Sequence, residues 1–382
     1  MTELITGSKE LIRDINSKLV LETVIREKNI SRASIAKELG LTKATVSAIV
    51  SDLIERGLVA ETGSGDTASG RKPIMLRFVA EAGYVISVDL GVSVINVART
   101  DLLGENVSIT TAETPESPED TLDVLEKLID SQIDRAADSR YGLVGIAIGI
   151  HGAVKDNKVL FTPYYKMDEL DLQEMLTSRY KTNVYLENEA NLSALGEGTF
   201  IHNCDMLVNI SVHSGIGMGI LFDQNIREGA EGNAGEIGHT IVEVDGRPCP
   251  CGNKGCLEQY VSERVLFAEF ARKKGRKAVD PDEFFEMYAA KDKDAVETVD
   301  RFVKYMAVGV GNVINTLDPD IVVINSSFVA NVPRLTGKIQ KKLTCRIAKN
   351  KKIEASSLQD ASTLLGGVYL VVKKFTGINR FA

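Results

Sequence analysis

The chain has 382 residues, of which 44% are hydrophobic and 26% charged, as is typical of folded globular proteins. This length exceeds what one hydrophobic core usually spans and predicts two or three domains. No stretch approaches the roughly 18 apolar residues of a membrane span, and residues 1–14 lack the apolar core of a signal peptide. We therefore expect a cytoplasmic protein that does not enter a membrane.

Charge is unevenly distributed along the chain. The total of −8 argues against a protein that binds nucleic acid over its whole surface. Residues 1–80, however, carry 12 Lys and Arg against 10 Asp and Glu, a balance of +2, which leaves −10 for residues 81–382. A mildly basic segment on an acidic body indicates a small DNA-reading module joined to a larger domain.

Three helices are predicted within the first 60 residues. Apolar side chains recur at helical spacing in residues 9–28 and predict a buried face made of Leu11, Ile12, Ile15, Leu19, Val24 and Ile25. Ser31 is a predicted N-cap for a short helix over residues 32–39. Gly40 makes the following turn, and Thr42 caps a third helix whose predicted inward face is Val46, Ile49, Val50 and Leu53.

Two short helices around a tight glycine turn predict a helix-turn-helix, and a strand at Ile74–Phe78 predicts a wing. The pattern from Ser31 to Ser47 closely resembles the winged-helix domains of bacterial repressors. The predicted DNA contacts are Ser31, Arg32, Thr42, Lys43, Ala44, Thr45 and Ser47 and, at the base of the wing, Arg71 and Lys72. The alternative is a helical cap or protein-interaction domain followed by a Gly/Ser-rich linker.

The body contains an internal repeat. Residues 84–107 predict a β-hairpin and a third strand, and residues 206–226 repeat the pattern of strand, glycine-rich turn and strand. Such a repeat predicts two similar α/β lobes around a cleft. Further predicted elements are a helix near 119–137, strands at 143–150 and 184–187, a helix near 300–317 and a strand at 321–325.

Three of the five cysteines lie within eight residues and share a region with one histidine. One imidazole and three thiolates complete a tetrahedral zinc site without an open position, so we predict structural zinc on His239, Cys249, Cys251 and Cys256. Incidental free thiols or a redox switch are the alternatives. Cys204 and Cys345 are predicted to lie in the core.

Residues 232–259, GNAGEIGHTIVEVDGRPCPCGNKGCLEQ, resemble the most specific segment of the ROK family (repressors, open reading frames, kinases). The resemblance extends over almost the whole chain. It implies an α/β protein in which a winged helix-turn-helix, residues 1–80, precedes a two-lobed actin/hexokinase-like body, residues 81–382, that binds sugar and carries the zinc loop. The segments LENEAN and LFTPYY are most similar to the xylose-responsive repressors of the family.

The resemblance also assigns a sugar site. It implies contacts from Gly152, Asn188, Glu189, Glu236, His239 and Glu258, all of which except the glycine carry a polar side chain suited to sugar hydroxyls. His239 would serve both zinc and sugar, because zinc on one ring nitrogen leaves the other to bind a hydroxyl. His151 stands where kinases of the family have a small residue or proline, which favours a different ligand preference.

The same comparison argues against catalysis. Glu189 replaces the catalytic aspartate, and an added methylene displaces the carboxylate by on the order of 1 Å, enough to slow the reaction. Three phosphate-binding loops have each lost a glycine, at residues 89–93, 213–215 and 325–327. We expect no ATP binding and no enzyme activity, and Asp89 is predicted to cap a hairpin turn rather than to bind magnesium.

The sequence thus predicts a repressor of sugar-utilisation genes that binds double-stranded operator DNA as a homodimer or dimer of dimers. The family resemblance favours release from the operator by a monosaccharide, with D-xylose the leading effector, and a corepressor that tightens DNA binding is the alternative. Two further alternatives stay open: an active sugar kinase with a DNA-binding head, and a repressor controlled by a protein partner.

Overall fold

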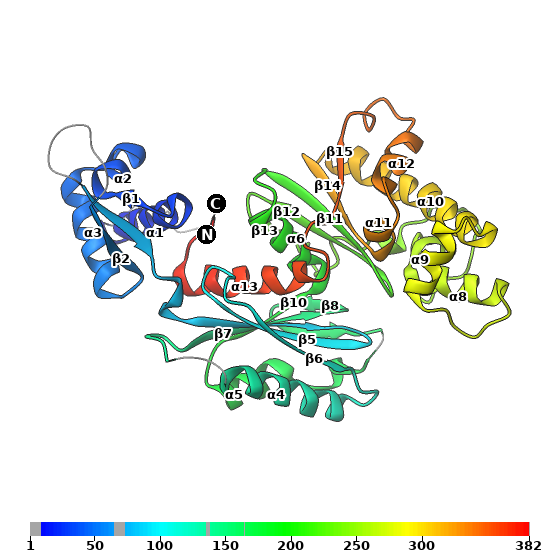
Figure 1. Ribbon diagram of the computed structural model, residues 1–382, viewed down its shortest axis with the longest axis horizontal. Helices are drawn as coiled ribbons and strands as arrows, with labels where there is room; N and C mark the ends of the chain where they lie inside the picture. Colours follow the sequence, from blue (N-terminus) through cyan, green and yellow to red (C-terminus); the bar gives the residue numbers. More distant parts are fainter. Residues whose placement is uncertain (1–8, 65–72, 135–137, 164, 382) are drawn as a thin grey trace, which may run out of the picture.

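A computed structural model describes residues 9–64, 73–134, 138–163 and 165–381. It consists of a small N-terminal head, residues 9–80, and a body of two lobes (Figure 1). The head lies at the left of Figure 1, the first lobe below the centre and the second lobe at the right.

The head has the predicted helix-turn-helix and wing strands. Its elements are α1 (Lys9–Glu27), β1 (Ile30–Ser31), α2 (Arg32–Leu39), α3 (Lys43–Glu55), β2 (Val59–Ser64) and β3 (Ile74–Phe78), with β3 central in the small sheet. The predicted caps are confirmed, since the Ser31 and Thr42 side chains accept hydrogen bonds from the third residue of the following turn. Gly40 ends α2 in the left-handed conformation, at φ 64°.

The predicted inward face of α1 is correct only in its second half. Val20, Leu21, Val24 and Ile25 are buried in the core of the head. Leu11, Ile12, Ile15 and Leu19 are 39–52% exposed instead. Helical spacing marks an apolar face but not its partner, and the small core of the head is packed against the second half of the helix.

The first lobe is a five-stranded sheet of order β10-β7-β4-β5-β6. Its strands are β4 (Tyr84–Leu90), β5 (Val94–Asp101), β6 (Ser108–Glu113), β7 (Leu143–Ile150) and β10 (Val184–Asn188). β4, β7 and β10 are parallel, and β4, β5 and β6 form an antiparallel meander. The helices α4 (Pro118–Asp134) and α5 (Leu172–Tyr180) cover the lower face of this sheet in Figure 1, and the small hairpin β8 (Ala153–Lys155) and β9 (Lys158–Phe161) follows β7.

The second lobe repeats this topology, which confirms the predicted duplication. Its order is β13-β12-β11-β14-β15, with an antiparallel meander followed by parallel strands. The strands are β11 (Met206–Val212), β12 (Ile216–Phe222), β13 (Asn225–Ile226), β14 (Ile321–Asn325) and β15 (Lys352–Ala355). The helices are α7 (Glu258–Val261), α8 (Glu263–Lys273), α9 (Pro281–Ala289), α10 (Lys293–Leu317), α11 (Ser327–Asn331) and α12 (Leu335–Lys342).

Two helices join the lobes. α6 (Glu189–Phe200) packs on β11 and β12, α13 (Ala361–Thr376) packs on β4 and β7, and the two helices pack against each other. Gly196 and Gly366 permit this approach, because a Cβ at Gly366 would lie 1.8 Å from the Leu192 carbonyl oxygen. α13 therefore lies at the junction of the two lobes.

The segment after α13 continues to the head (Figure 1). Ile378 and Phe381 are buried in the same apolar cluster as Val20 and Val24 of α1. The Asn379 backbone N–H donates to Glu22 Oε1, at 2.5 Å. The C-terminal segment thus connects the interface between the lobes to the first helix of the head.

The first lobe also contacts the head directly. The Tyr141 hydroxyl donates to the Arg56 carbonyl oxygen at 2.7 Å, and Arg140 Nη2 donates to the Glu55 carbonyl oxygen at 2.8 Å. Both acceptors lie at the end of α3. The helix expected to face DNA is therefore seated on the body.

Two smaller expectations can be compared with the structure. Cys345, predicted to lie in the core, is exposed because it follows α12 on the surface, whereas Cys204 is half-buried against the apolar cluster that joins the head to both lobes. Among the described residues, no helix combines the length and the apolar composition that crossing a membrane requires.

Candidate functional site

A cavity of about 520 Å³, here called the central cleft, lies between the two lobes. All six residues predicted to bind the effector line it, namely Gly152, Asn188, Glu189, Glu236, His239 and Glu258. The first three come from the β7–β8 turn and the β10–α6 junction of the first lobe. The other three come from the second lobe. A ligand held by this set would touch both lobes.

Asn188 and Gly152 shape one wall of the cleft. The Asn188 side chain caps α6, accepting from the backbone N–H groups of Ala190 and Asn191, and its Nδ2 donates to the Gly152 carbonyl oxygen at 2.8 Å. A Cβ at Gly152 would lie 2.2 Å from the Phe161 carbonyl oxygen. Hydrogen bonds and close packing within the protein thus hold this wall of the cleft in place.

The carboxyl groups of the cleft are placed to accept hydrogen bonds. Glu189 and Glu258 are each 8% exposed. Burial raises the pKa of Glu189, while the nearby His151 and His213 act to lower it. Burial likewise raises the pKa of Glu236. Carboxyl groups withdrawn from bulk water suit the hydroxyls of a small polar ligand.

His151 pairs with Asp89 at the edge of the cleft, which the sequence did not predict. Its Nε2 lies 2.9 Å from Asp89 Oδ1, so Asp89 does not cap a hairpin turn as predicted but neutralises the imidazole. Burial alone would lower the pKa of His151, yet the charge and hydrogen bond of Asp89, together with Glu189, raise it to about 9. The Asp89 carboxylate therefore favours the protonated form of His151 and balances its charge at the edge of the cleft.

The four predicted metal ligands come together beside the cleft. One donor atom from each of His239, Cys249, Cys251 and Cys256 lies within 4.8 Å of all the others. Tight turns make this possible, because Gly255 has φ 80° and a Cβ there would lie 1.7 Å from the Glu243 carbonyl oxygen. All five cysteines are free thiols.

The spacing of these donors fits a tetrahedral metal ion. Cys249 Sγ lies 3.6 Å from His239 Nδ1, and Cys251 Sγ lies 3.7 Å from Cys256 Sγ. Zinc–ligand bonds at tetrahedral angles require about 3.6 Å between sulfur and nitrogen and about 3.8 Å between sulfurs. The other nitrogen of His239, Nε2, lies 3.8 Å from Glu236 Oε2, in the cleft. One imidazole thus faces both the sulfur cluster and the cleft.

The carboxylate of Glu263 lies at the start of α11, the helix that follows strand β14. Glu263 Oε1 accepts from the Ser327 backbone N–H at 2.7 Å and from the Ser326 hydroxyl at 3.0 Å. The Glu263 backbone N–H in turn donates to the His213 carbonyl oxygen, at 2.9 Å. The segments 213–215 and 325–327, two of the three loops in which the sequence predicts lost phosphate-binding glycines, are therefore connected through Glu263.

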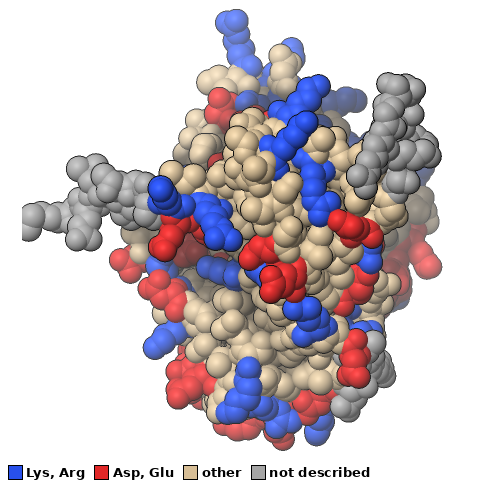
Figure 2. All heavy atoms as spheres, turned by 90° about the vertical axis from the view of Figure 1, so that its left-hand side faces the viewer, with Lys and Arg blue, Asp and Glu red and all other residues tan. Residues whose placement is uncertain are grey.

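On the head, the start of α3 is open to solvent. Thr42, Lys43, Ala44 and Ser47 are exposed, and Thr45 is half-buried with its hydroxyl 2.8 Å from that of Thr42. Figure 2 views the molecule from the side of the head, where basic side chains gather in the upper part of the face and mix with acidic ones below. This surface has the small polar and basic side chains that major-groove contacts use.

Other predicted DNA contacts are used within the protein or lie elsewhere. Ser31 is buried as the cap of α2, and Arg32 forms an ion pair with Glu61 of the wing strand, with Nη2 and Oε1 2.8 Å apart. Arg71 and Lys72 lie outside the described residues.

The residues that line the central cleft without having been assigned to it from the sequence include Phe161, His213 and Arg264. Phe161 is 58% exposed despite its size, and an aromatic ring at the mouth of a polar cavity offers an apolar platform to a sugar ring. The sequence marks the segment 160–165 only through its resemblance, because a single phenylalanine at the end of a strand carries no signal of its exposure.

Comparison with known proteins places these features in context. A ROK family model matches residues 85–374, and a MarR family model matches residues 15–68. The chain is 32% identical to the xylose repressor of Bacillus subtilis over 377 residues, 97% of this chain and 98% of that protein.

One solved structure is similar to this chain over nearly its full length, and another is similar over about three quarters of it. The crystal structure of a ROK family transcriptional regulator, a homologue of the E. coli MLC protein, aligns with a TM-score of 0.80 at 25% identity and covers 96% of this chain and 97% of its own. A ROK family glucokinase from Streptomyces griseus, in complex with glucose and AMPPNP, aligns with a TM-score of 0.68 at 25% identity, over 75% of this chain and 99% of its own.

Proposed function

The chain belongs to the ROK family, and we propose that it is a transcriptional repressor whose head binds operator DNA and releases it when D-xylose occupies the central cleft. The observation that carries this proposal is that six predicted residues, five of them polar and one a glycine, come from both lobes and line one cavity. The head sits on the same body through α13 and the residues that follow it.

The ligand proposed for the cleft is a monosaccharide. Its hydroxyls would bond to the carboxyl groups of Glu189, Glu236 and Glu258 and to Nε2 of His239, and its ring would lie against Phe161. D-xylose is favoured because repressors bearing its name are 30–33% identical to this chain over nearly its full length.

The proposed DNA contacts are residues of the head. Thr42, Lys43, Ala44, Thr45 and Ser47 would meet the major groove, with Ser31 and Arg32 holding α2 and the wing beside it. Arg71 and Lys72 would contact the DNA from the wing. Access to chromosomal DNA implies a cytoplasmic location.

We propose that the body has no catalytic activity. Phosphate groups bind where backbone N–H groups are free, and here Glu263 accepts from the Ser327 N–H and from the Ser326 hydroxyl. A nucleotide phosphate would have to displace this carboxylate or lie next to it, at a cost in electrostatic repulsion. In a kinase, the aspartate at the position of Asp89 would be expected to approach magnesium. Here Asp89 is paired with His151 instead. We expect neither ATP binding nor phosphorylation.

The cluster of His239, Cys249, Cys251 and Cys256 is proposed to hold structural zinc. Three thiolates and an imidazole leave no open coordination position, so the ion would fold the loop and orient His239 rather than activate water. By fixing Nδ1 as the ligand, it would leave Nε2 facing the cleft for the sugar.

Release from DNA would follow from closure of the cleft. A sugar held by both lobes favours one angle between them, and α13 with the residues after it would carry that change to α1. As a homodimer or dimer of dimers, the protein would place two heads about 34 Å apart on the DNA, and a rotation of each body would move them out of register. The exposed apolar face of α1, at Ile12, Ile15 and Leu19, offers surface for such an assembly.

The test uses the full chain and a DNA duplex selected by it from a random pool. We expect gel-shift binding that weakens progressively as D-xylose is added, with L-xylose and sucrose as controls. Binding that ignores or is strengthened by D-xylose would overturn induction by this sugar. Phosphorylation of D-xylose with ATP would instead support a kinase, and sugar-independent release by a cellular extract would support control by a protein partner.

A further inference from the structure

A second cavity, here called the rear cavity, lies behind the β10–α6 junction and has a volume of about 490 Å³. Its lining shares no residue with that of the central cleft. Tyr185, Leu186 and Glu187 of β10 line the rear cavity, whereas Asn188, the next residue, lines the central cleft. We propose that the rear cavity binds a small anion bearing hydroxyl groups, a sugar phosphate or a sugar acid.

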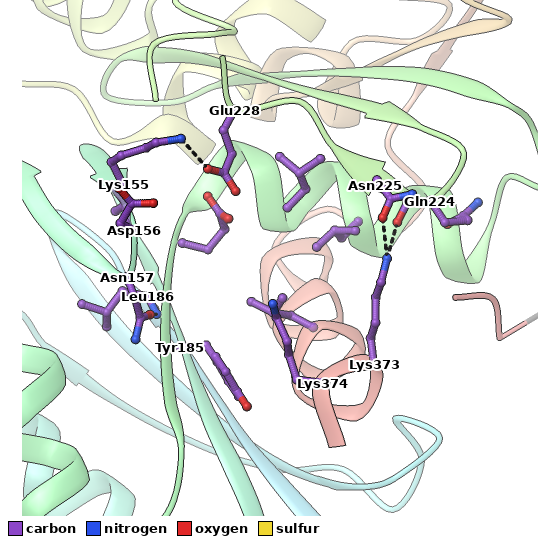
Figure 3. A pocket seen from close by; sticks show the side chains of 15 residues that line it. Lys155, Asp156, Asn157, Tyr185, Leu186, Gln224, Asn225, Glu228, Lys373 and Lys374 are labelled. Atoms are coloured by element: carbon purple, nitrogen blue, oxygen red, sulfur yellow. Dashed lines mark hydrogen bonds and ion pairs between the residues drawn. The ribbon is translucent and has the colours of Figure 1, made fainter. Parts of the chain in front are cut away.

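One end of the rear cavity carries cations without carboxylate partners. Lys373 Nζ donates to the Gln224 carbonyl oxygen and to Asn225 Oδ1, each at 2.9 Å, and forms no ion pair with a described residue. Lys374, next to it, forms neither a hydrogen bond nor an ion pair within the described part of the chain. Figure 3 shows both side chains extending from α13 into the cavity, opposite Lys155, Asn157 and Tyr185.

This pair of lysines is electrostatically unfavourable as it stands. Burial and the neighbouring charge of Lys374 lower the pKa of Lys373. A phosphate or carboxylate between the two ammonium groups would relieve both effects and gain charge-assisted hydrogen bonds. The lysine end of the cavity therefore selects an anion.

The opposite end selects hydroxyl groups. Glu187 is 9% exposed, and its Oε1 accepts from the Asn188 N–H at 2.8 Å and from Asn191 Nδ2 at 2.9 Å. Oε2 accepts no hydrogen bond from a described residue. The pKa of Glu187 is raised to about 7, chiefly by burial, so the group can accept from or donate to a hydroxyl near neutral pH. Glu228 also lines this end and is paired with Lys155, with Oε2 and Nζ 3.2 Å apart, so the lysine at this end already has a carboxylate partner.

The two ends of the rear cavity together define its ligand. The lysine end carries two cations that form no ion pair with a described residue, and Lys373 Nζ donates only to oxygens of Gln224 and Asn225. The other end carries the buried carboxyl group of Glu187. This combination matches a hydroxylated anion better than an apolar ligand or a bare ion.

The position of the cavity links such a ligand to the head. Lys373 and Lys374 form the last turn of α13, a few residues before Asn379, which bonds to Glu22 of α1. Arg380 forms an ion pair with Asp223, beside the turn that Lys373 holds, with Nη2 and Oδ1 2.5 Å apart. An anion that draws Lys373 from this turn would shift the C-terminal segment. This coupling to DNA, unlike binding itself, rests on the proposed function.

The test is isothermal titration of the full chain with D-ribose 5-phosphate and D-gluconate, with D-ribose and inorganic phosphate as references. Saturating D-xylose is present to fill the central cleft. We expect one of the two anions to bind at least tenfold more tightly than either reference, and the tighter one identifies the anionic group. K374Q should weaken it about tenfold, the size of a lost charge-assisted hydrogen bond, and E187Q should weaken it severalfold. K293Q, on the exposed start of α10, should leave it unchanged.

Several outcomes would overturn the proposal. These are no binding of either anion at millimolar concentration, equal binding of inorganic phosphate, or K374Q binding as tightly as the parent chain. If D-xylose does not bind, the titrations are carried out without it, and the comparison of K374Q with the parent chain still tests binding in the rear cavity. Failure of the proposed function is thereby distinguished from failure of this inference. Unchanged affinity for the selected DNA with the anion bound would overturn the coupling to the head.

Discussion

His151 Nε2 and Asp89 Oδ1 lie 2.9 Å apart and join the end of β4 to the turn after β7 at the edge of the central cleft. Both side chains are largely buried, at 16% and 17% exposed. The pair connects the ends of two strands of the first-lobe sheet through side chains. It also makes the protein sensitive to pH in a definite direction.

We expect D89N to lose stability mainly at low pH. The pKa of His151 is raised from 6.5 to about 9, so its stabilisation is complete below pH 6.5 and is lost as the pH rises through 9. The shift corresponds to up to about 3 kcal/mol of unfolding free energy. In urea unfolding, the free energies of unfolding of the parent chain and of D89N should differ strongly at pH 6 and hardly at all at pH 10. A difference that does not change with pH would contradict the role of this pair.

Removing a metal ligand should weaken sugar binding as well as folding. We expect about one zinc ion per chain, and C251S should lose it and bind D-xylose at least tenfold more weakly, because His239 is no longer oriented. Metal analysis and calorimetry measure the two effects. C345S, which removes an exposed thiol outside the cluster, is the matched control. Unchanged D-xylose affinity in zinc-free protein would show that the loop does not shape the cleft.

The charge of Glu189 should be needed for sugar affinity. E189Q keeps the shape of this buried side chain but removes its charge, and a lost charge-assisted hydrogen bond costs about 1.5–3 kcal/mol, or roughly tenfold or more in affinity. Calorimetric titration with D-xylose measures it. E174Q, on the exposed side of α5, should bind as the parent chain does. Equal affinities of E189Q and the parent would place the sugar elsewhere.

Restoring the catalytic aspartate should not restore a kinase. E189D returns the shorter side chain, but Glu263 still accepts from Ser326 and Ser327 where phosphate would need free N–H groups. We expect no ADP release above background from the parent chain or from E189D with ATP and D-xylose or D-glucose. Turnover by E189D would mean that the altered loops still accept a nucleotide.

Lys43 should contribute to DNA binding without contributing to sequence preference. It is exposed at the first position of α3, where a lysine reaches phosphate. K43A should weaken DNA binding severalfold for all sequences and reduce the slope of log K against log salt by about 1. K127A, on α4 of the first lobe, is the control for a general change in charge. A loss restricted to particular sequences would indicate a base contact instead.

Much of this architecture is predictable because it is local. Thr42 caps α3, and Gly40 is left-handed, because each depends on only a few neighbouring residues. The repeated strand pattern predicts both lobes, and the spacing from Cys249 to Cys256 predicts a metal cluster, since a short loop brings its own side chains together. The six cleft residues were assigned through a family resemblance, and the structure brings all of them to one cavity.

The remaining features depend on contacts between distant parts of the chain. Periodicity identifies an apolar face on α1, but only the packed structure shows that Val20 and Val24 are covered while Ile12 and Ile15 are not. The pairing of His151 with Asp89 joins two strands, and Asn379 reaches Glu22 across almost the whole sequence. Spacing along a chain carries no information about such encounters, because burial and electrostatic pairing are set by which surfaces meet after folding. The link from the cleft to the head, on which regulation would depend, is therefore visible only in three dimensions.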